Sequence, residues 1–169
     1  MLKRARLELS RSQILAFRRR VGALDKRLPR GAPSLRRAAW AGLQDSMPRA
    51  ALLSIHARVG GAHPSSWEDP ALVQVWGPRF STYVVPVQDH ALFTLGRLSD
   101  NGPGRQRAED VAAQLHEFLD GRRMGDGQIG RALGVHPNRF RYAAPTGTVL
   151  IRWGGARRPI VWTVPRPPS

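Results

Sequence analysis

The sequence predicts a mainly helical α+β protein, and three observations support that prediction. Apolar side chains recur every three or four residues in several segments, as they do on the buried side of amphipathic helices. Short β-branched segments occur as "TYVVPV" at 82–87 and, near the C-terminus, as "TGTVLIRW" and "PIVWTV". The stretch "SDNGPGRQR" is rich in turn-forming residues and divides the chain near 100–104.

Three helices are expected before residue 60. Ser10 and Gln13 form the S-x-x-Q pattern of a capping box at the start of the first helix. Apolar residues then recur at helical spacing, namely Ile14, Phe17, Val21 and Leu24. The segment "RLPRGAP" breaks this helix, Ser34 is expected to cap the second, and Pro48 fits the first turn of the third.

The middle of the chain is expected to close a first module. Segment 82–87 is predicted to be a strand, and Pro86 favours a position at the edge of a sheet. The segment "DHALFTLGRL" that follows is predicted to be a short helix. The expected organisation is a first module at 8–99, a linker at 100–104, a second module at 105–164 and a tail at 165–169. The similar order of elements on both sides of the linker favours two similar modules.

The second module has the pattern of a helix-turn-helix. An amphipathic helix is expected to end at Gly121, and a second, capped by Asp126, to end at Gly134, whose left-handed conformation turns the chain sharply. A third helix begins at Pro137 with Phe140 turned inward. His136 is expected to be a cap or a surface residue rather than a metal ligand. The residues expected inside are Ala108, Val111, Ala112, Leu115, Phe118, Leu119, Ile129, Ala132, Leu133 and Val135.

Two β-rich segments joined by "GGARR" follow these three helices, which is the order of a winged helix. The predicted fold is therefore α+β and mainly helical, with tandem winged-helix modules. A helix that enters a major groove needs donors and acceptors on its outer face, and a hairpin tip with arginines can reach phosphates. The alternative is that the same packing only builds a small core, as in winged helices that bind protein.

Positive charge is in excess and unevenly placed. The chain carries 27 Lys+Arg and 12 Asp+Glu, a formal net charge of +15. Residues 1–60 hold 14 basic and 3 acidic side chains, residues 61–120 hold 4 and 8, and residues 121–169 hold 9 and 1. Such an excess attracts polyanions, with nucleic acid the first candidate and an acidic membrane surface the second.

Other features narrow the class of protein. The absence of cysteine excludes disulfides and cysteine-based metal sites, and no recognisable metal-ligand spacing occurs. The N-terminal segment lacks the apolar run of a signal peptide, and no stretch approaches the ~20 apolar residues of a membrane span. We expect a cytoplasmic, nucleoid-associated protein with no cofactor and no metal.

Four stretches of the chain carry a family resemblance: "LSRSQILAFRR", "GLQDSMPRAALLSIHARV", "LVQVWGPRFSTYVVP" and the second module. Together they resemble the bacterial winged-helix family that includes the AlkZ-like DNA glycosylases, over roughly 8–164. The resemblance implies tandem winged helices that bind DNA, in a family whose members are typically longer. This chain is therefore similar to the first two modules, counted from the N-terminus, of a family member.

The resemblance also implies a catalytic motif of Gln, any residue, then Gln or Asp, which orients a water and stabilises positive charge on the sugar. Gln44 matches the first position, whereas Ser46 replaces the second and Asp45 lies one residue away. Where members carry "RGT-x-H", this chain has "RFSTY", so that Arg79 and Thr82 match and Tyr83 lies near the position of the histidine. The alternative role for Gln44 is structural, at a helix C-terminus.

We therefore expect a protein that binds double-stranded DNA on one concave surface lined by basic side chains from both ends of the chain. Two alternatives remain: an active glycosylase acting on alkylated bases, and a protein-interaction domain or truncated inactive paralogue. The candidate catalytic residues are Gln44 and Ser46. The expected DNA contacts are Arg18, Arg19, Arg49, Arg79, Asn138, Arg139, Arg141, Tyr142, Arg157 and Arg158.

Overall fold

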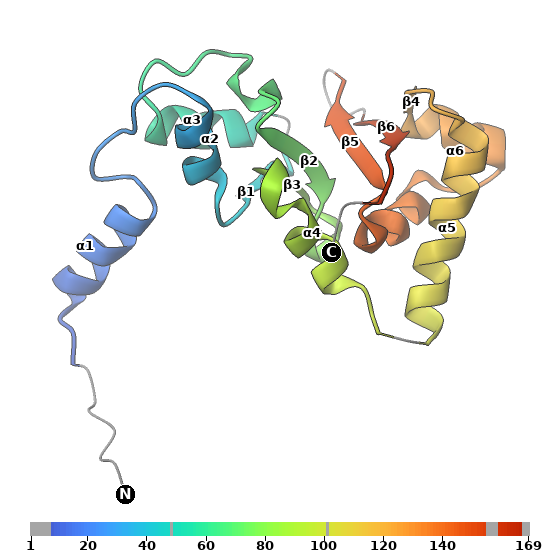
Figure 1. Cartoon of the computed structure of the whole chain (residues 1–169), viewed down its shortest axis with the longest axis horizontal. Coiled ribbons are helices and arrows are strands. Elements are labelled where there is room, and N and C mark those ends of the chain that lie inside the picture. The colour runs from blue at the N-terminus through green and yellow to red at the C-terminus, as the bar shows by residue number, and fades with distance from the viewer. Residues whose placement is uncertain (1–7, 48, 101, 155–158, 167–169) are drawn as a thin grey trace, which may run out of the picture.

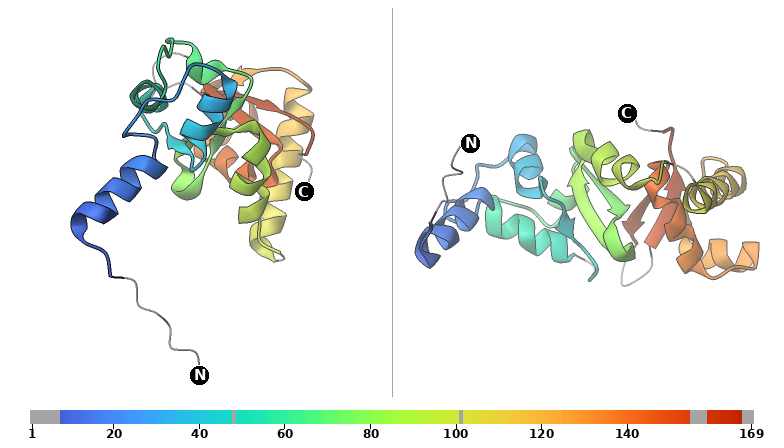
Figure 2. Two further views of the ribbon diagram at one scale, coloured as in Figure 1. Left: turned by 60° about the vertical axis from the view of Figure 1, so that its left-hand side comes forward. Right: turned by 90° about the horizontal axis from the view of Figure 1, so that it is seen from below.

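The structure is a computed structural model that describes residues 8–47, 49–100, 102–154 and 159–166. It confirms the mainly helical α+β class, with two small antiparallel sheets of three strands each (Figures 1 and 2). The strand order is β1-β3-β2 in the first sheet and β4-β6-β5 in the second. Apart from the first helix and the short helical turns within and after the first hairpin, each half of the chain runs through a helix, a short strand, a helix, a 3-10 helix and two longer strands.

The first helix, α1 (Arg11–Val21), begins as the capping box predicts. The Gln13 amide donates to the Ser10 hydroxyl at 3.2 Å, and the Ser10 amide donates to the Gln13 side chain at 2.8 Å. No residue of α1 is buried, and Phe17 is 66% exposed. Figure 1 shows α1 extending from the end of the molecule opposite to α5 and α6. Its apolar stripe is therefore largely open to solvent.

The first sheet and the helices on it share one hydrophobic core, which includes Leu35, Ile55, Trp67 and Val84. Strand β3 is paired with β1 on one side and β2 on the other. The elements of this half are α2 (Ala32–Ala39), β1 (Leu43–Gln44), α3 (Ala50–Arg58), η1 (Ser66–Glu68), β2 (Leu72–Trp76), η2 (Pro78–Phe80) and β3 (Thr82–Pro86).

Two local predictions in this half are wrong. Ser34 is buried within α2 and does not cap it, because the chain enters the helix earlier, at Gly31. Strand β3 is the central strand of its sheet rather than an edge strand. Pro86 is accommodated because it is the last residue of β3, and the bond to the neighbouring chain is made by the next residue, whose amide donates to the Ala71 carbonyl at 3.0 Å. Pro48 lies outside the described residues.

Short helical turns lead from the first sheet to α5 (Pro103–Leu119). They are η3 (Val87–Asp89), α4 (His90–Phe93) and η4 (Leu95–Arg97), in the segment expected to form a short helix. Helix α5 begins inside the stretch expected to be a linker, with Pro103 in its first turn. It ends before Gly121, as predicted, with Asp120 in the left-handed conformation.

The second half contains β4 (Met124–Gly125), α6 (Asp126–Leu133), η5 (Pro137–Thr146), β5 (Val149–Trp153) and β6 (Pro159–Thr163). Gly134 adopts φ 66°, as predicted for the turn before η5. His136 caps η5 by accepting from the Asn138 amide at 3.2 Å, which confirms its expected role. Asp126 is the first residue of α6 rather than its cap, and Ala132 is exposed rather than buried.

The third helix of this half differs in kind from the prediction, because η5 is a 3-10 helix. Its Phe140 is buried as expected, together with Ala143 and Ala144. Gly130 lets α6 approach the turn closely, since a Cβ there would lie 2.7 Å from the Val135 carbonyl oxygen. The chain thus enters η5 through a turn with little room for adjustment.

The two halves share buried side chains. Trp76, the last residue of β2, belongs to the hydrophobic core of the second half, beside Leu115, Phe140 and Ile151. A further cluster joins Val75 and Val85 of the first sheet to Leu150 of the second. Cutting the chain near 100–104 would therefore expose apolar surface on both sides, and the division into two modules stays a prediction.

Candidate functional site

Gln44 and Ser46 lie side by side on the surface of the first sheet. Strand β1 ends at Gln44, and both side chains are exposed. The Gln44 side-chain amide donates to the Ser46 hydroxyl at 2.9 Å. Side chains alternate between the two faces of an extended chain, so residues 44 and 46 share one face and Asp45 takes the other. Gln44 therefore ends a strand, not a helix as its alternative role required.

Asp45 is completely buried, and its hydrogen bonds join the two halves of the protein. One carboxylate oxygen accepts from the Ala51 amide at 2.9 Å, at the start of α3, and the other from the Gln74 side-chain amide at 2.7 Å. The Gln74 side-chain oxygen accepts from the Trp153 amide at 3.1 Å. The Trp153 indole donates to the Asp45 carbonyl at 3.0 Å. We call Asp45, Gln74 and Trp153 the buried relay.

The buried relay fixes the loop that carries Gln44 and Ser46 against β2 and β5. Burial raises the pKa of the Asp45 carboxyl above its ordinary value of 3.8. Hydrogen bonds from the Ala51 and Ala50 amides and from the Trp153 side chain oppose that shift. Asp45 cannot reach a ligand on the outer face, so only Gln44 and Ser46, on either side of it, are available to a ligand there.

The tip of the β2–β3 hairpin has an unusual backbone. Arg79 and Phe80 both lie in the left-handed region, with φ 54° and φ 58°. Non-glycine residues rarely adopt this conformation, and where they do the surrounding structure holds them in it. Arg79 and Phe80 are exposed, whereas Thr82 is buried at the start of β3.

Tyr83 packs where two glycines leave room for its ring. A Cβ on Gly77 would lie 2.3 Å from the Tyr83 ring, and one on Gly42 would lie 3.2 Å from it. The ring thus lies against two stretches of backbone, at the position where the resemblance implies a histidine. Arg97, close to this ring, donates to the Trp76 carbonyl at 2.9 Å.

The outer face of η5 meets the hairpin tip. The Arg141 guanidinium donates to the Phe80 carbonyl at 3.2 Å, and the Phe80 and Tyr142 rings pack edge to face with centroids 5.2 Å apart. The Arg107 guanidinium, from α5, also lies over the Tyr142 ring, 5.2 Å from its centroid. Arg139 is exposed beside them, and Arg107, Val111, Arg139 and Tyr142 line a hollow of about 310 Å³.

Arg141 also lies near an acidic group. Burial raises the pKa of Asp126, opposed by a hydrogen bond from the Gly127 amide and by the positive charges of Arg141 and His136. Part of the charge on Arg141 is therefore compensated within the protein. Asn138, two residues before Phe140, is exposed.

The structure brings together only some of the predicted DNA contacts. Arg79 neighbours Phe80 at the hairpin tip, which touches Arg141 and Tyr142. Arg18 and Arg19 lie on α1, at the opposite end of the molecule from α5 and α6 (Figures 1 and 2). The expected single surface lined from both ends of the chain stays a prediction.

The remaining predicted contacts have separate positions. Arg49 is exposed just before α3, with φ 70°. Arg157 and Arg158 lie outside the described residues. Three contributors were missed by sequence reasoning: Arg107, Phe80 and Gln74. The polar side of the predicted helix around 108–119 was the only signal for Arg107, and nothing in the sequence linked Gln74 to Asp45.

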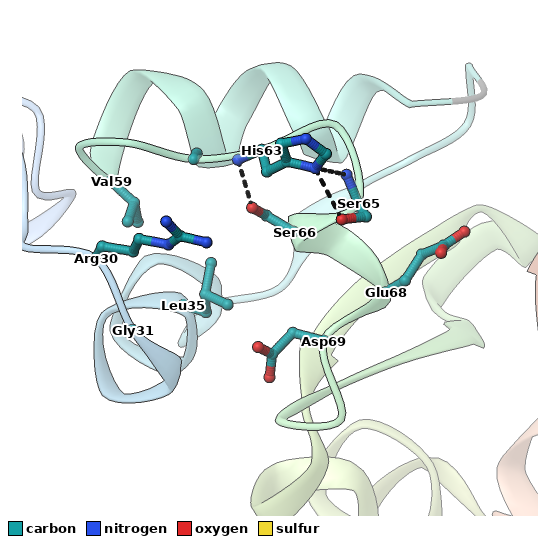
Figure 3. Close-up of a pocket in the computed structure, with 10 residues that line it drawn as sticks. Arg30, Gly31, Leu35, Val59, His63, Ser65, Ser66, Glu68 and Asp69 are labelled. Carbon is teal, nitrogen blue, oxygen red and sulfur yellow. Dashed lines mark hydrogen bonds between the residues drawn. The ribbon is translucent and has the colours of Figure 1, made fainter.

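A separate pocket of about 520 Å³ lies in the first half, between the start of α2 and the loop after α3 (Figure 3). Arg30 points toward His63 and Ser66, and Glu68 and Asp69 also line the pocket, with the Glu68 carboxylate directed away from Arg30. The His63 amide donates to the Ser66 hydroxyl at 2.7 Å. None of the predicted site residues lines this pocket, and its two carboxylates disfavour an anionic ligand.

Two kinds of feature are absent from the described residues. No cluster of three or more His, Asp or Glu side chains suitable for a metal ion occurs among them. No helix in the same part of the chain is long and apolar enough to cross a membrane.

Comparison with known proteins identifies a fold. No protein-family model matches the sequence, and no characterised protein matches it in sequence. Among solved structures, the Streptomyces sahachiroi DNA glycosylase AlkZ is similar, with a TM-score of 0.69 and 15% sequence identity. The likeness covers 93% of this chain and 50% of AlkZ, so the chain spans about half the length of that protein. This chain therefore has the fold of one half of the AlkZ DNA glycosylase.

Proposed function

We propose that this protein binds double-stranded DNA through two winged-helix modules. The observation that carries the proposal is the fold shared with a DNA glycosylase over nearly the whole chain, in a protein of net charge +15. The repeated order of helix, short strand, helix, 3-10 helix and two strands supports the winged-helix assignment. We further propose that the protein works at the nucleoid, in the cytoplasm.

Most of the positive charge is available to a partner. Among the described residues, only two ion pairs form, Arg20 with Asp25 and Arg105 with Glu109. Of the other basic side chains there, Arg58, Arg97, Arg122 and Arg141 donate to backbone carbonyls, and others are exposed to solvent or lie over aromatic rings. Each phosphate that such side chains neutralise releases counterions, which makes the affinity for DNA strongly dependent on salt.

Binding is tested by fluorescence anisotropy of a labelled duplex at several salt concentrations. We expect the logarithm of the association constant to fall linearly with the logarithm of salt concentration, with a slope of roughly −0.9 per phosphate contacted. A protein-interaction domain or an inactive paralogue would give no binding, or binding with a shallow slope. Either result would remove the DNA-binding proposal.

A second candidate function is hydrolysis of the N-glycosidic bond of alkylated bases. The observation that favours it is that Gln44 and Ser46, which the sequence resemblance aligns with a catalytic motif, form an exposed, hydrogen-bonded pair. As the base departs, the sugar becomes positively charged, and polar oxygens nearby lower that barrier electrostatically. Ser46 carries no charge, so we expect activity only on cationic bases, which are good leaving groups.

This second function is tested by incubating the protein with duplex DNA that contains 7-methylguanine, under single-turnover conditions. We expect free 7-methylguanine and abasic sites to form, and both to be lost in Gln44→Ala. Ser46→Asp, which restores a carboxylate at the second position of the motif, is expected to raise the rate. No base release from the unaltered protein would leave DNA binding alone.

A further inference from the structure

We propose that the hollow between α5 and η5 is a binding site for one backbone phosphate of duplex DNA, held by Arg107 and Arg139. The proposal rests on the proposed DNA-binding function and names what this part of the surface recognises. It also assigns η5 a different task from the base reading expected of a helix in a major groove. We call the hollow the α5–η5 notch.

The α5–η5 notch has the size and lining of an anion site. Its volume is about 310 Å³, and its walls are Arg107, Val111, Arg139 and Tyr142. Two of these four side chains are guanidinium groups, whose planar donors match the oxygens of a phosphate. Val111 is buried and closes the floor, and Tyr142, 39% exposed, presents an aromatic wall.

The arginines of the α5–η5 notch form no ion pair with the neighbouring acidic residues of α5. Glu109 is paired with Arg105 at 2.9 Å, and the Asp110 carboxylate accepts from the Gln106 side chain at 2.7 Å. Neither Arg107 nor Arg139 forms an ion pair within the described ranges. The Arg107 guanidinium lies over the Tyr142 ring, and this contact leaves the guanidinium N–H groups free to donate to a ligand.

The 3-10 geometry of η5 places its two notch-lining residues, Arg139 and Tyr142, on the same side of the helix. Side chains three residues apart eclipse each other in a 3-10 helix, and Arg139 and Tyr142 have that spacing. The Phe80 ring, at the hairpin tip, packs edge to face with Tyr142. Tyr142 is thus in contact with both Phe80 and Arg107, which fixes one wall of the notch before any ligand arrives.

The same contacts argue against base reading by η5. A helix that reads a major groove presents three or four free side chains to base edges. Here Arg141 is bonded to the Phe80 carbonyl, and Tyr142 is packed on both sides, so only Asn138 and Arg139 remain free. A phosphate contact positions the duplex without reading its sequence.

The test measures the affinity of the chain of residues 1–169 for three duplexes of unrelated sequence, at several salt concentrations. We expect Arg107→Ala and Arg139→Ala each to weaken binding about fivefold to tenfold at low salt, equally on all three duplexes. Because both arginines serve one phosphate, the double variant should reduce the salt slope by about 1, not by 2. Arg30→Ala, which removes the same charge beside Glu68 and Asp69, is the matched control and should change little.

Two further arms identify the source of the phosphate. Inorganic phosphate at millimolar concentration should not displace the duplex, and vesicles of anionic phospholipid should bind no more weakly to Arg139→Ala than to the unaltered protein. Vesicle binding lost in Arg139→Ala, with DNA binding intact, would assign the notch to a lipid headgroup and overturn the proposal. Circular dichroism confirms that the exposed substitutions leave the fold intact.

Failure of this inference is distinct from failure of the proposed function. No binding of any duplex by the unaltered protein would remove both. Normal binding by both arginine variants, or a change in preference among the three duplexes in Asn138→Ala, would overturn the notch and leave DNA binding in place. A double variant whose slope falls by about 2 would show two phosphates and refute the single site.

Discussion

The buried relay of Asp45, Gln74 and Trp153 makes a directional prediction. A carboxylate only accepts, so Gln74 must donate to Asp45 through its amide nitrogen. Its oxygen is then turned toward Trp153, where it accepts from the backbone amide. In Asp45→Asn, the single side-chain oxygen can accept from the Ala51 amide or from Gln74, but not from both. If it faces Ala51, the new NH2 can bond Gln74 only if Gln74 rotates, which brings two N–H groups together at Trp153. If it faces Gln74, the new NH2 meets the Ala51 amide, so either orientation leaves one buried donor unsatisfied.

The magnitude follows from that count. One buried unsatisfied donor costs about 1–3 kcal/mol, so Asp45→Asn should lower the free energy of unfolding by that amount. Gln74→Glu places a second carboxylate against the first, and either repulsion or protonation of one of them costs a similar amount. In the double variant, the amide introduced at position 45 donates to the carboxylate introduced at position 74. That carboxylate also accepts from the Trp153 amide, so every bond of the relay is restored and the loss should be below about 1 kcal/mol.

The assay is a double-mutant cycle measured by urea and thermal unfolding. For a protein of this length, about 2 kcal/mol corresponds to a decrease of roughly 4–8 °C in Tm, which is readily resolved. Gln88→Glu makes the same chemical change at an exposed position and should have little effect. If the double variant is destabilised by the sum of the two single losses, the relay does not have the polarity described, and the reasoning fails.

Three further predictions concern stability. Burial lowers the pKa of His90, whose Nε2 has no hydrogen-bond partner within the described ranges, so the unfolded chain binds this proton first as pH falls. The free energy of unfolding should therefore decrease from about pH 7.5 downward through 6.5, by up to ~1.4 kcal/mol per pH unit. His90→Gln should flatten that part of a Tm–pH profile. Gly77→Ala should destabilise by about 1–3 kcal/mol, because its Cβ would lie 2.3 Å from the Tyr83 ring, and an unchanged urea midpoint would contradict the packing described. Removal of residues 1–21 should change Tm by less than about 2 °C, because α1 buries no side chain, whereas a cooperative loss of structure would show that α1 is covered in solution.

The sequence predicted the elements that depend on neighbours in the chain. The capping box at Ser10 and the left-handed glycine at 134 are local signals, and both are present where expected. Strand β3 was found for the same reason, from its β-branched residues. Its central position was not, because strand order depends on pairing with β1 and β2 from elsewhere in the chain.

The candidate site was less accessible to sequence reasoning, because its geometry depends on distant contacts. The alternative role placed Gln44 at a helix C-terminus, where Asp45 would be rotated by about 100° from it. In the observed strand geometry, Asp45 instead points inward and takes part in the buried relay. The kind of local structure thus decided which of the three adjacent side chains is free.

The positions of Arg107 and Phe80 in the candidate DNA surface also depend on contacts between distant segments. Each is ordinary in its own segment, one on the polar side of α5 and the other at a hairpin tip. They belong to the candidate DNA surface because both contact Tyr142 of η5, and neither contact can be predicted from the residues of α5 or of the hairpin alone.

A physical consequence connects the buried relay with the α5–η5 notch. The β2–β3 hairpin takes part in both: Gln74 lies within β2, and Phe80 lies at the tip beyond its end. Between them, Trp76 is buried in the core of the second half. A duplex held at the proposed phosphate site would contact Tyr142, which packs against this hairpin, and the hairpin's other contacts fix the loop of Gln44 and Ser46. Because packed cores transmit small displacements rather than absorb them, occupancy of the notch and the position of that exposed pair should be coupled.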